Sequence, residues 1–327
     1  MTDTPIERPM TRLVARGDSA RPFELAELPA LLADPANAVW IDLENTGREG
    51  FEQLEPTLLF HPMAIDDCIM DVNFPRVDDY DKYVYLAVHS ARWDEGDPEP
   101  LIKELDVLLG KNYIVTYHEE PTRGIAKAMD LVTRRGQLLA RGPDHLLYFI
   151  LDVMVDNYMP ILEKIQTRVD EFEERVVRTP SRELLTEVLH FKRATAALRR
   201  IVGPQRDTLL ALTRDEYDVI RPEMRPYLRD VYDRLARISD LLDSFRDELA
   251  TMLDIYVSQV SNSLNEVMKV LTAITVVIVP VTLVASIYGM NVKFPGIDTR
   301  HGFYEAVAIM VVTAAAMLWY FRSRKWL

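Results

Sequence analysis

The strongest constraint on this chain is an uncharged run near its C-terminus, from Val270 to Val292. At about 1.5 Å per residue, a helix of this length crosses a hydrocarbon core of roughly 30 Å. A second apolar run, from Ala306 to Phe321, follows after a short connection between Asn291 and Gly302. So short a connection forces the two spans into an antiparallel hairpin with both outer ends on one side. The sequence therefore predicts a two-span membrane protein.

The residues around the spans predict their orientation. Basic residues stand at both outer ends: Lys269, Arg322, Arg324 and Lys325. By the positive-inside rule these ends face the cytoplasm, and Trp319, Tyr320 and Trp326 fit an interfacial aromatic belt there. Residues 1–5 begin no basic-then-apolar signal sequence. We therefore expect a multi-pass protein of the cell (inner or plasma) membrane, in contact with membrane lipid, with both termini in the cytoplasm.

Charge divides the chain into two parts. Five basic and two acidic residues follow Lys269, so residues 1–269 carry −16 against a total of −13. Such acidity argues against nucleic acid as a partner, because phosphate binding needs clustered Lys and Arg. It either attracts cations or serves solubility alone. Cys68 is the single cysteine, which excludes a disulfide or a thiolate metal site within one chain.

The pattern before the first span predicts an α+β cytoplasmic domain, α/β sandwich-like, followed by long stalk helices and the two-helix transmembrane hairpin. β-rich stretches occur at 38–43, 83–88, 104–109 and 113–117. Helical patterns cover 122–134, 143–177, 182–201 and the chain from Met224 onward. No proline or glycine lies between Tyr227 and Pro280, so one helix of some 60 residues, about 90 Å long, continues into the membrane.

These patterns divide the chain into five expected segments. They are an α/β domain at 1–141, a helical hairpin region at 142–221, the long helix with the first span at 222–292, an extracytoplasmic loop at 293–302, and the second span with its basic tail at 303–327.

Small and polar residues recur on one face of the long helix, in steps of seven and then alternate fours and threes, from Asp240 to Ser286. This repeat is typical of helices bundled around a common axis, and hydroxyl groups inside a span need partners other than lipid. The stripe predicts a water path between several copies, with simple helix packing as the alternative. Met268 and Leu271 form either a hydrophobic gate or core packing. The candidate pore-lining residues are Asp254, Asn265, Met268, Leu271, Thr272, Thr275, Val279, Thr282 and Ser286.

Several motifs carry a family resemblance. Gly289, Met290 and Asn291 stand after the first of two C-terminal spans. This tripeptide is the hallmark of the CorA family of divalent-cation channels, which the chain resembles. Further similar features are the stretches at 61–67, 226–233 and 261–271 and the basic Trp-Leu terminus. The resemblance covers essentially the whole chain beyond about residue 10.

The resemblance implies a homopentamer whose pore is lined by five copies of the long helix. Carboxamide oxygens of Asn291, joined by backbone carbonyls near Gly289, would form the selectivity filter. Neutral oxygens suit Mg²⁺, which dehydrates reluctantly, because they hydrogen-bond the waters of a hydrated ion. Lower ion positions fall at Thr282, Asn265 and Asp254. Uptake is passive, since a potential of about 100 mV favours inward movement of a divalent ion by about 4.6 kcal/mol.

The resemblance also implies closure by cytoplasmic Mg²⁺, which bridges carboxylates of neighbouring subunits. The matching residues are Asp67 with Asp230 at one site and Asp66 with Asp152 at a second. Carboxylates held together repel one another unless a divalent ion lies between them, so loss of Mg²⁺ would loosen the ring. Alternatively, these residues are solvated surface acids. Asp66 stands where a glutamate is expected, and its reach is shorter.

Two other positions depart from the family pattern. Lys293 follows the tripeptide where acidic residues are common, and Val279 replaces an expected methionine. The ion stays open among Mg²⁺, Co²⁺ and Ni²⁺, and the zinc-transporting branch (Zn²⁺) is the alternative. A non-conducting membrane sensor of cations is the alternative of a different class. We expect no enzyme, because the histidines are scattered and no Gly-x-Ser-x-Gly, P-loop or Cys-His pairing is present.

Overall fold

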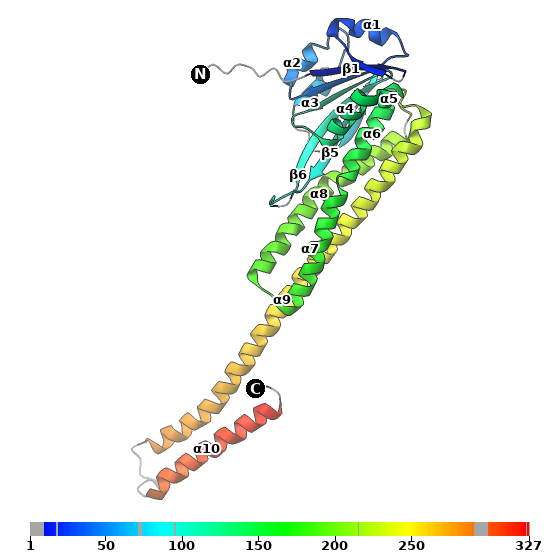
Figure 1. Ribbon diagram of the computed structural model, residues 1–327. Helices are drawn as coiled ribbons and strands as arrows, with labels where there is room; N and C mark the ends of the chain where they lie inside the picture. Colours follow the sequence, from blue (N-terminus) through cyan, green and yellow to red (C-terminus); the bar gives the residue numbers. More distant parts are fainter. Residues whose placement is uncertain are drawn as a thin grey trace, which may run out of the picture. The chain divides into compact units, whose positions relative to one another are not determined.

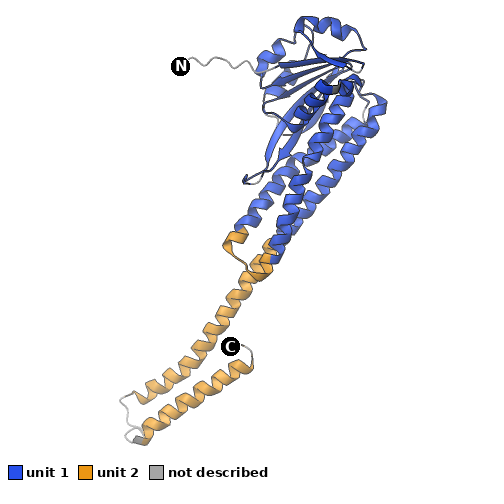
Figure 2. Cartoon of the chain, viewed as in Figure 1, with its two compact units in different colours: residues 1–174, 186–251 blue, residues 175–185, 252–327 orange. Residues whose placement is uncertain are grey.

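The computed structural model describes residues 10–17, 19–70, 74–94, 96–214, 216–290, 300–324 and 326. The chain forms two compact units (Figure 2). The first, unit 1, comprises residues 1–174 and 186–251, and the second, unit 2, comprises residues 175–185 and 252–327. The five segments expected from the sequence stay a prediction, because this division follows packing rather than the order of the chain.

Unit 1 contains a mixed sheet with the strand order β2-β1-β3-β7-β6-β5-β4 (Figure 1). Strands β3 and β7 are parallel, and the other neighbouring pairs are antiparallel. The predicted stretches are all observed, as β3, β5, β6 and β7, but β1, β2 and β4 were missed. The strands are β1 Met10–Arg16, β2 Ser19–Pro22, β3 Ala38–Glu44, β4 Arg76–Asp79, β5 Tyr83–Arg92, β6 Leu101–Gly110 and β7 Tyr113–His118.

Helices cover both faces of the sheet. Alternate residues of β3, Val39, Ile41 and Leu43, share one apolar cluster with residues of α1 (Leu28–Ala33), α2 (Gly47–Glu52) and α3 (Pro62–Ile69). The other face carries Trp40, which donates to Thr116 at 3.0 Å. Against that face pack α4 (Arg123–Arg135), α5 (Gln137–Ala140) and α6 (Pro143–Asp156). The three layers confirm the expected α+β fold and explain why the central strands are apolar on both faces.

The helical region differs from the prediction in two places. The expected helix at 143–177 is two helices, α6 and α7 (Met159–Arg178), which break at Tyr158. The Tyr158 hydroxyl donates to the buried carbonyl of His89 at 3.0 Å, so the break places this ring against β5. Helix α8 (Arg182–Arg214) continues past the expected end at residue 201, because Pro204 is tolerated inside it.

The predicted long helix is confirmed. Helix α9 runs from Arg225 to Tyr288 without interruption, 64 residues, and includes Pro280. A single 3₁₀ turn, Pro222–Met224, precedes it, and another, Leu25–Glu27, precedes α1. The second apolar run forms α10, from Arg300 to Ser323, longer at both ends than the run that predicted it.

A buried acidic group lies between the sheet and α3. Asp106 on β6 is 2 % exposed and accepts a hydrogen bond from the Tyr85 hydroxyl at 2.7 Å. Burial, and then the charge of Glu104, raise the pKa of Asp106 well above its ordinary 3.8. Burial also raises the pKa of the nearby Cys68 thiol, so this region favours neutral side chains.

Asp106→Asn should remove a pH-dependent cost to stability. In the folded chain Asp106 keeps its proton at a pH where the unfolded chain has lost it, so stability falls as pH rises above 3.8, by up to about 1.4 kcal/mol per pH unit. The amide retains the acceptor for Tyr85 and cannot ionise. We expect the variant to exceed the wild type in melting temperature by more at pH 8 than at pH 5, in purified full-length protein.

The matched control is Asp97→Asn, which changes an exposed aspartate of the same unit. Its melting temperature should follow the wild type at both pH values. An equal shift for Asp106→Asn at pH 5 and pH 8 would show that this carboxyl ionises normally in the folded protein.

Candidate divalent-cation sites

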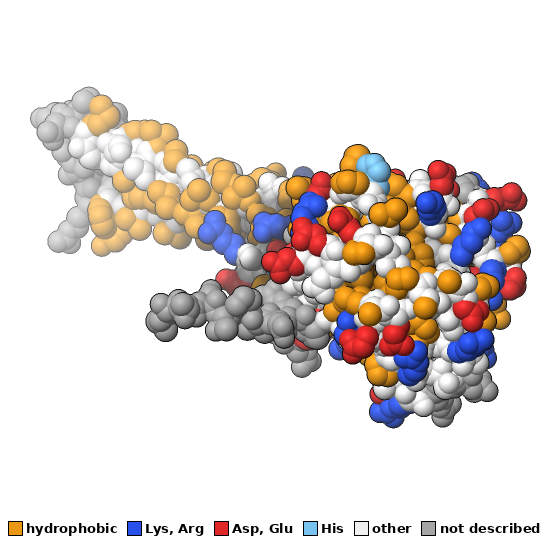
Figure 3. Space-filling model, turned by 90° about the horizontal axis from the view of Figure 1, so that it is seen from above, with side chains coloured by type: hydrophobic (Ala, Val, Ile, Leu, Met, Phe, Trp, Pro, Cys, Tyr) orange, Lys and Arg blue, Asp and Glu red, His pale blue; other side chains and the backbone are white. Residues whose placement is uncertain are grey.

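Two helices are long and apolar enough to cross a membrane. The helical segment Pro222–Tyr288 contains a window of mean hydropathy 2.5 that is 6 % buried, and His301–Ser323 contains one of 1.6 that is 11 % buried. A core helix of a soluble protein would be mostly buried, whereas these apolar side chains lie on the surface (Figure 3). The two predicted spans are therefore present as exposed apolar helices.

The predicted pore-lining residues share one exposed face of α9. At 3.6 residues per turn, all nine fall within about one third of the helix circumference. Each of them is exposed in the single chain: Asp254, Asn265, Met268, Leu271, Thr272, Thr275, Val279, Thr282 and Ser286. The geometry leaves this face open to another chain, and their role in a pore stays a prediction.

Three threonines of this face satisfy their hydroxyl protons within the helix. Each donates to the carbonyl four residues earlier: Thr272 to Met268 at 2.7 Å, Thr275 to Leu271 at 2.9 Å and Thr282 to Ile278 at 2.9 Å. A hydroxyl has one proton and two acceptor lone pairs. With the proton used internally, the exposed oxygen is left as an acceptor, which is what the waters around a cation require.

The tripeptide of the resemblance begins where α9 ends. The Gly289 N–H donates to the Ala285 carbonyl at 2.9 Å, and the Met290 N–H donates to Ile287 at 3.3 Å. A Cβ added to Gly289 would lie 3.1 Å from the Ala285 oxygen, a tight approach that favours glycine. Asn291 and Lys293 lie outside the described residues. The filter assignment therefore stays a prediction.

The four predicted regulatory carboxylates lie on three helices of unit 1. Asp66 and Asp67 are on α3, Asp152 is on α6 and Asp230 is on α9. Each is paired with an arginine: Asp66 with Arg48, Asp67 with Arg76, and both Asp152 and Asp230 with Arg234. Within the described ranges, no three His, Cys, Asp or Glu residues are grouped so as to hold a metal ion.

Arg234 is the functional candidate that sequence reasoning missed. Its guanidinium contacts Asp152, lies 2.7 Å from Asp156 and lies 3.3 Å from Asp230. Burial acts to lower the pKa of Arg234, but the aspartates, Asp152 first, outweigh it and raise the pKa above its ordinary value. The available signal was the i,i+4 spacing of Asp230 and Arg234 on one helix. The partner on α6 could not be read from that spacing.

Asp152 and Asp230, the two predicted ligands that pair with Arg234, differ in their exposure to solvent. The Asp152 side chain is 26 % exposed, whereas that of Asp230 is 66 % exposed. Asp230 therefore keeps carboxylate lone pairs open to solvent, while Asp152 is held mainly by Arg234. A divalent ion at Asp152 would have to share or displace this guanidinium.

The comparisons with known proteins agree with this geometry. The family model of the CorA-like Mg²⁺ transporter protein matches residues 35–324. The chain is 33 % identical over 316 residues to the cobalt/magnesium transport protein CorA of Thermotoga maritima, covering 94 % of this chain and 89 % of that protein. The zinc transport protein ZntB of Yersinia pseudotuberculosis is 21 % identical, over 90 % of each chain. The solved CorA magnesium transporter of Methanocaldococcus jannaschii matches with a TM-score of 0.83 at 21 % identity, over 98 % of this chain and 100 % of that one.

A chain with two exposed apolar helices, one of them continuous with a soluble α+β unit, and with this family match is a membrane transporter of divalent cations. It belongs to the CorA family. This confirms the resemblance drawn from Gly289, Met290, Asn291 and the flanking stretches. The family consists of transporters, in agreement with the expectation that the chain is not an enzyme.

Arg234→Gln should weaken the contact between α6 and α9. Removing the guanidinium leaves the carboxylates of Asp152, Asp156 and Asp230 without their shared counter-ion, at a cost of about 1–3 kcal/mol. We expect a lower melting temperature in EDTA. We also expect added Mg²⁺ to raise the melting temperature of this variant more than that of the wild type, because an ion can neutralise the exposed carboxylates.

The control is Arg246→Gln on the same helix, where the exposed arginine pairs with Asp243 and Asp247 of α9 itself. This change should be nearly neutral. If both variants melt at the same temperature as the wild type, Arg234 does not hold the two helices together.

Proposed function

We propose that five copies of this chain form a channel for passive uptake of hydrated Mg²⁺, with Co²⁺ and Ni²⁺ as further permeant ions. The observation that carries the proposal is the continuity of α9, which joins unit 1 to the span and presents one exposed polar face. A polar stripe on a lipid-facing helix is unfavourable unless other copies cover it. Closing a ring of such helices places the stripe around a common axis.

The pore would be formed by the stripe residues of α9. The hydroxyl groups of Thr272, Thr275 and Thr282 donate hydrogen bonds within α9, so their oxygens would accept hydrogen bonds from the waters around an ion. Met268 and Leu271, exposed at 52 % and 55 % in the single chain, would form an apolar constriction nearer the cytoplasm. A ring of apolar side chains stops ions by excluding water when it is narrow.

The selectivity filter would lie at the C-terminal end of α9. The last carbonyls of a helix carry partial negative charge, which favours a cation at the end that Gly289 terminates. Asn291 would add carboxamide oxygens from each copy. Neutral oxygens that bind a hydrated ion favour Mg²⁺, whose waters are the hardest to remove.

Cytoplasmic Mg²⁺ would close the channel by binding between copies, at Asp67 with Asp230 and at Asp66 with Asp152. Each of these carboxylates is oriented by an arginine in the single chain, and an incoming ion would share or displace that guanidinium. Where Mg²⁺ binds, the ion replaces repulsion between acidic subunits with attraction. When Mg²⁺ falls, the subunits separate and the constriction widens.

The orientation proposed is that of the positive-inside rule, with both termini in the cytoplasm and the chain in the inner or plasma membrane, surrounded by lipid. Unit 1 then lies in the cytoplasm, where it samples the ion that the channel admits. Feedback requires this placement, because a sensor outside the cell would report the wrong concentration.

Two alternatives make different predictions for transport. The zinc-transporting alternative predicts that Zn²⁺ is taken up in preference to Mg²⁺, and the sensor alternative predicts binding without flux. The threonine hydroxyls of the span favour conduction, since a sensor needs no acceptor stripe there. Uptake of Mg²⁺, Co²⁺, Ni²⁺ and Zn²⁺ by reconstituted protein, over a range of internal Mg²⁺, separates all three.

Asn291→Ala should abolish selective Mg²⁺ uptake into proteoliposomes while leaving assembly intact, because the variant loses the carboxamide ring. Uptake is followed with a Mg²⁺-sensitive dye, and assembly by size-exclusion chromatography with light scattering. Asn262→Ala, which changes an exposed asparagine on α9 outside the stripe, is the control and should transport normally. Normal selective uptake by Asn291→Ala would remove this residue from the filter.

Asp230→Asn should weaken protection of unit 1 against protease by Mg²⁺, raising the half-protective concentration about tenfold or more. The reason is the loss of one charged oxygen ligand at each subunit boundary. Asp67→Asn should do the same. Asp233→Asn, three residues along α9 and paired with Arg229 at 3.4 Å, is the control that should keep the wild-type response. Equal protection in all three variants would show that Asp67 and Asp230 do not bind the ion.

A further inference from the structure

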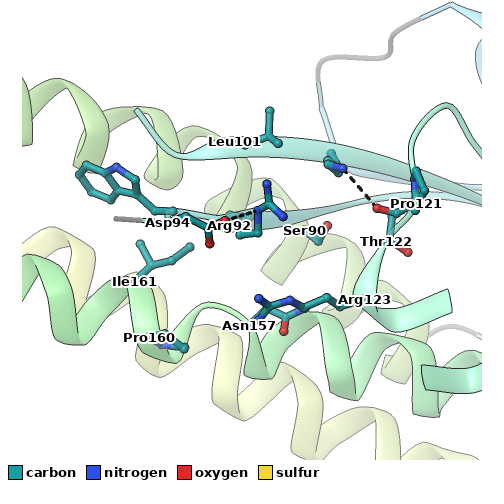
Figure 4. A pocket seen from close by; sticks show the side chains of 13 residues that line it. Ser90, Arg92, Asp94, Leu101, Pro121, Thr122, Arg123, Asn157, Pro160 and Ile161 are labelled. Atoms are coloured by element: carbon teal, nitrogen blue, oxygen red, sulfur yellow. Dashed lines mark hydrogen bonds and ion pairs between the residues drawn. The ribbon is translucent and has the colours of Figure 1, made fainter. Parts of the chain in front are cut away.

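A cavity of about 160 Å³ in unit 1 is lined by none of the four predicted regulatory carboxylates. Its walls are the end of β5, the start of β6, the first residues of α4 and the junction between α6 and α7 (Figure 4). No local sequence pattern predicts this cavity, because its residues come from four separate elements. Its lining is basic, whereas the predicted regulatory sites are acidic.

Positive charge gathers in this cavity. Arg92, Lys103 and Arg123 line it, and Asp94 is the single acidic residue among the described lining residues. Asp94 lies 3.2 Å from Arg92, and Lys103 pairs with Glu120 at 2.7 Å. With Arg92 and Lys103 each paired with a carboxylate, the charge of Arg123 is left in excess, within a strongly acidic part of the chain. A cation would be repelled from it and an anion attracted.

Arg123 has no ion pair or side-chain hydrogen bond with any described residue. It extends from α4 into the same gap as Arg92 on β5 (Figure 4). Two guanidinium groups that face one cavity repel each other, and an anion between them turns that repulsion into two attractions. A planar guanidinium also matches the oxygens of a phosphate with two parallel hydrogen bonds.

One hydroxyl that lines the cavity makes no hydrogen bond within the described part of the chain. Ser90 as a whole residue is 7 % exposed, and its hydroxyl oxygen is accessible from the cavity. This hydroxyl is therefore free to donate to a ligand in the cavity. The side-chain amide of Asn157, at the end of α6, lies in the same cavity and likewise makes no hydrogen bond within the described residues.

The first turn of α4 adds further donors. Thr122 caps this 13-residue helix, accepting from the Ile125 N–H at 3.3 Å. The backbone N–H groups of Arg123 and Gly124 have no acceptor among the described residues. The positive end of a helix favours an anion at this position. The first turn of α4 and the lining side chains therefore present hydrogen-bond donors to the same cavity.

We propose that this cavity binds a phosphate group, contributed either by inorganic phosphate or by a nucleotide. Its oxygens accept from the Arg92 and Arg123 guanidinium groups, from the Ser90 hydroxyl and from the first amides of α4. Lys103 supplies a further positive charge. The site is independent of the proposed transport function, since it needs neither a pore nor a divalent ion.

Calorimetric titration of the purified full-length protein with inorganic phosphate tests the proposal, at constant ionic strength in EDTA so that no divalent ion takes part. We expect saturable binding, with one phosphate per chain. Arg123→Gln should weaken binding about tenfold or more, because one charged donor is lost. Ser90→Ala should weaken it by a smaller factor. Parallel titrations with AMP and ATP distinguish the two sources of the phosphate.

Lys127→Gln is the matched control, since this exposed lysine lies one turn further along α4, outside the cavity lining. It removes the same charge from the same helix and should leave phosphate binding unchanged. Melting temperatures confirm that the variants are folded. Absence of saturable binding of phosphate, AMP and ATP in the wild type would overturn the proposal, and so would equal affinities for the Arg123 and Lys127 variants.

Discussion

A hydroxyl group in contact with hydrocarbon needs a hydrogen-bond partner, and this constraint governs the membrane part of the protein. Helix α9 satisfies the hydroxyl protons by itself, because Thr272, Thr275 and Thr282 donate to carbonyls of their own helix. The acceptor lone pairs of the same oxygens stay exposed. Water in a shared pore can donate hydrogen bonds to these oxygens and lipid cannot, which supports the proposed assembly.

In unit 1 the candidate regulatory carboxylates form ion pairs with arginines. Asp66, Asp67, Asp152 and Asp230 would repel a neighbouring acidic chain, and each is paired with a guanidinium in the single chain. A guanidinium carries one charge and a divalent ion two, so replacing the first with the second would change the electrostatic attraction between subunits in the proposed assembly. Arg234 is the partner of two of these carboxylates at once. Loss of this one arginine would therefore leave both Asp152 and Asp230 without their counter-ion.

The sequence predicts those features that depend on local pattern. The central strands and the length of α9 follow from β-rich runs and from the absence of helix breakers. The short strands β1, β2 and β4 were missed because their residues are mixed in polarity and are held by neighbouring strands. The helix expected at 182–201 ended too early, because α8 continues through Pro204 and its packing outweighs the one hydrogen bond that proline removes. Arg234 and the basic cavity depend on contacts between distant elements, which no local pattern contains.

One helix connects the two kinds of candidate site in unit 1. Helix α6 carries Asp152 and Asp156, which hold Arg234, and the residue that follows it, Asn157, lines the basic cavity. A displacement of α6 along its axis would therefore alter the carboxylates and the cavity together. If an anion in the cavity favours one position of α6, a divalent ion at Asp152 that favours the same position must bind more tightly in its presence. By linkage the two ligands would then change each other's affinity by the same factor.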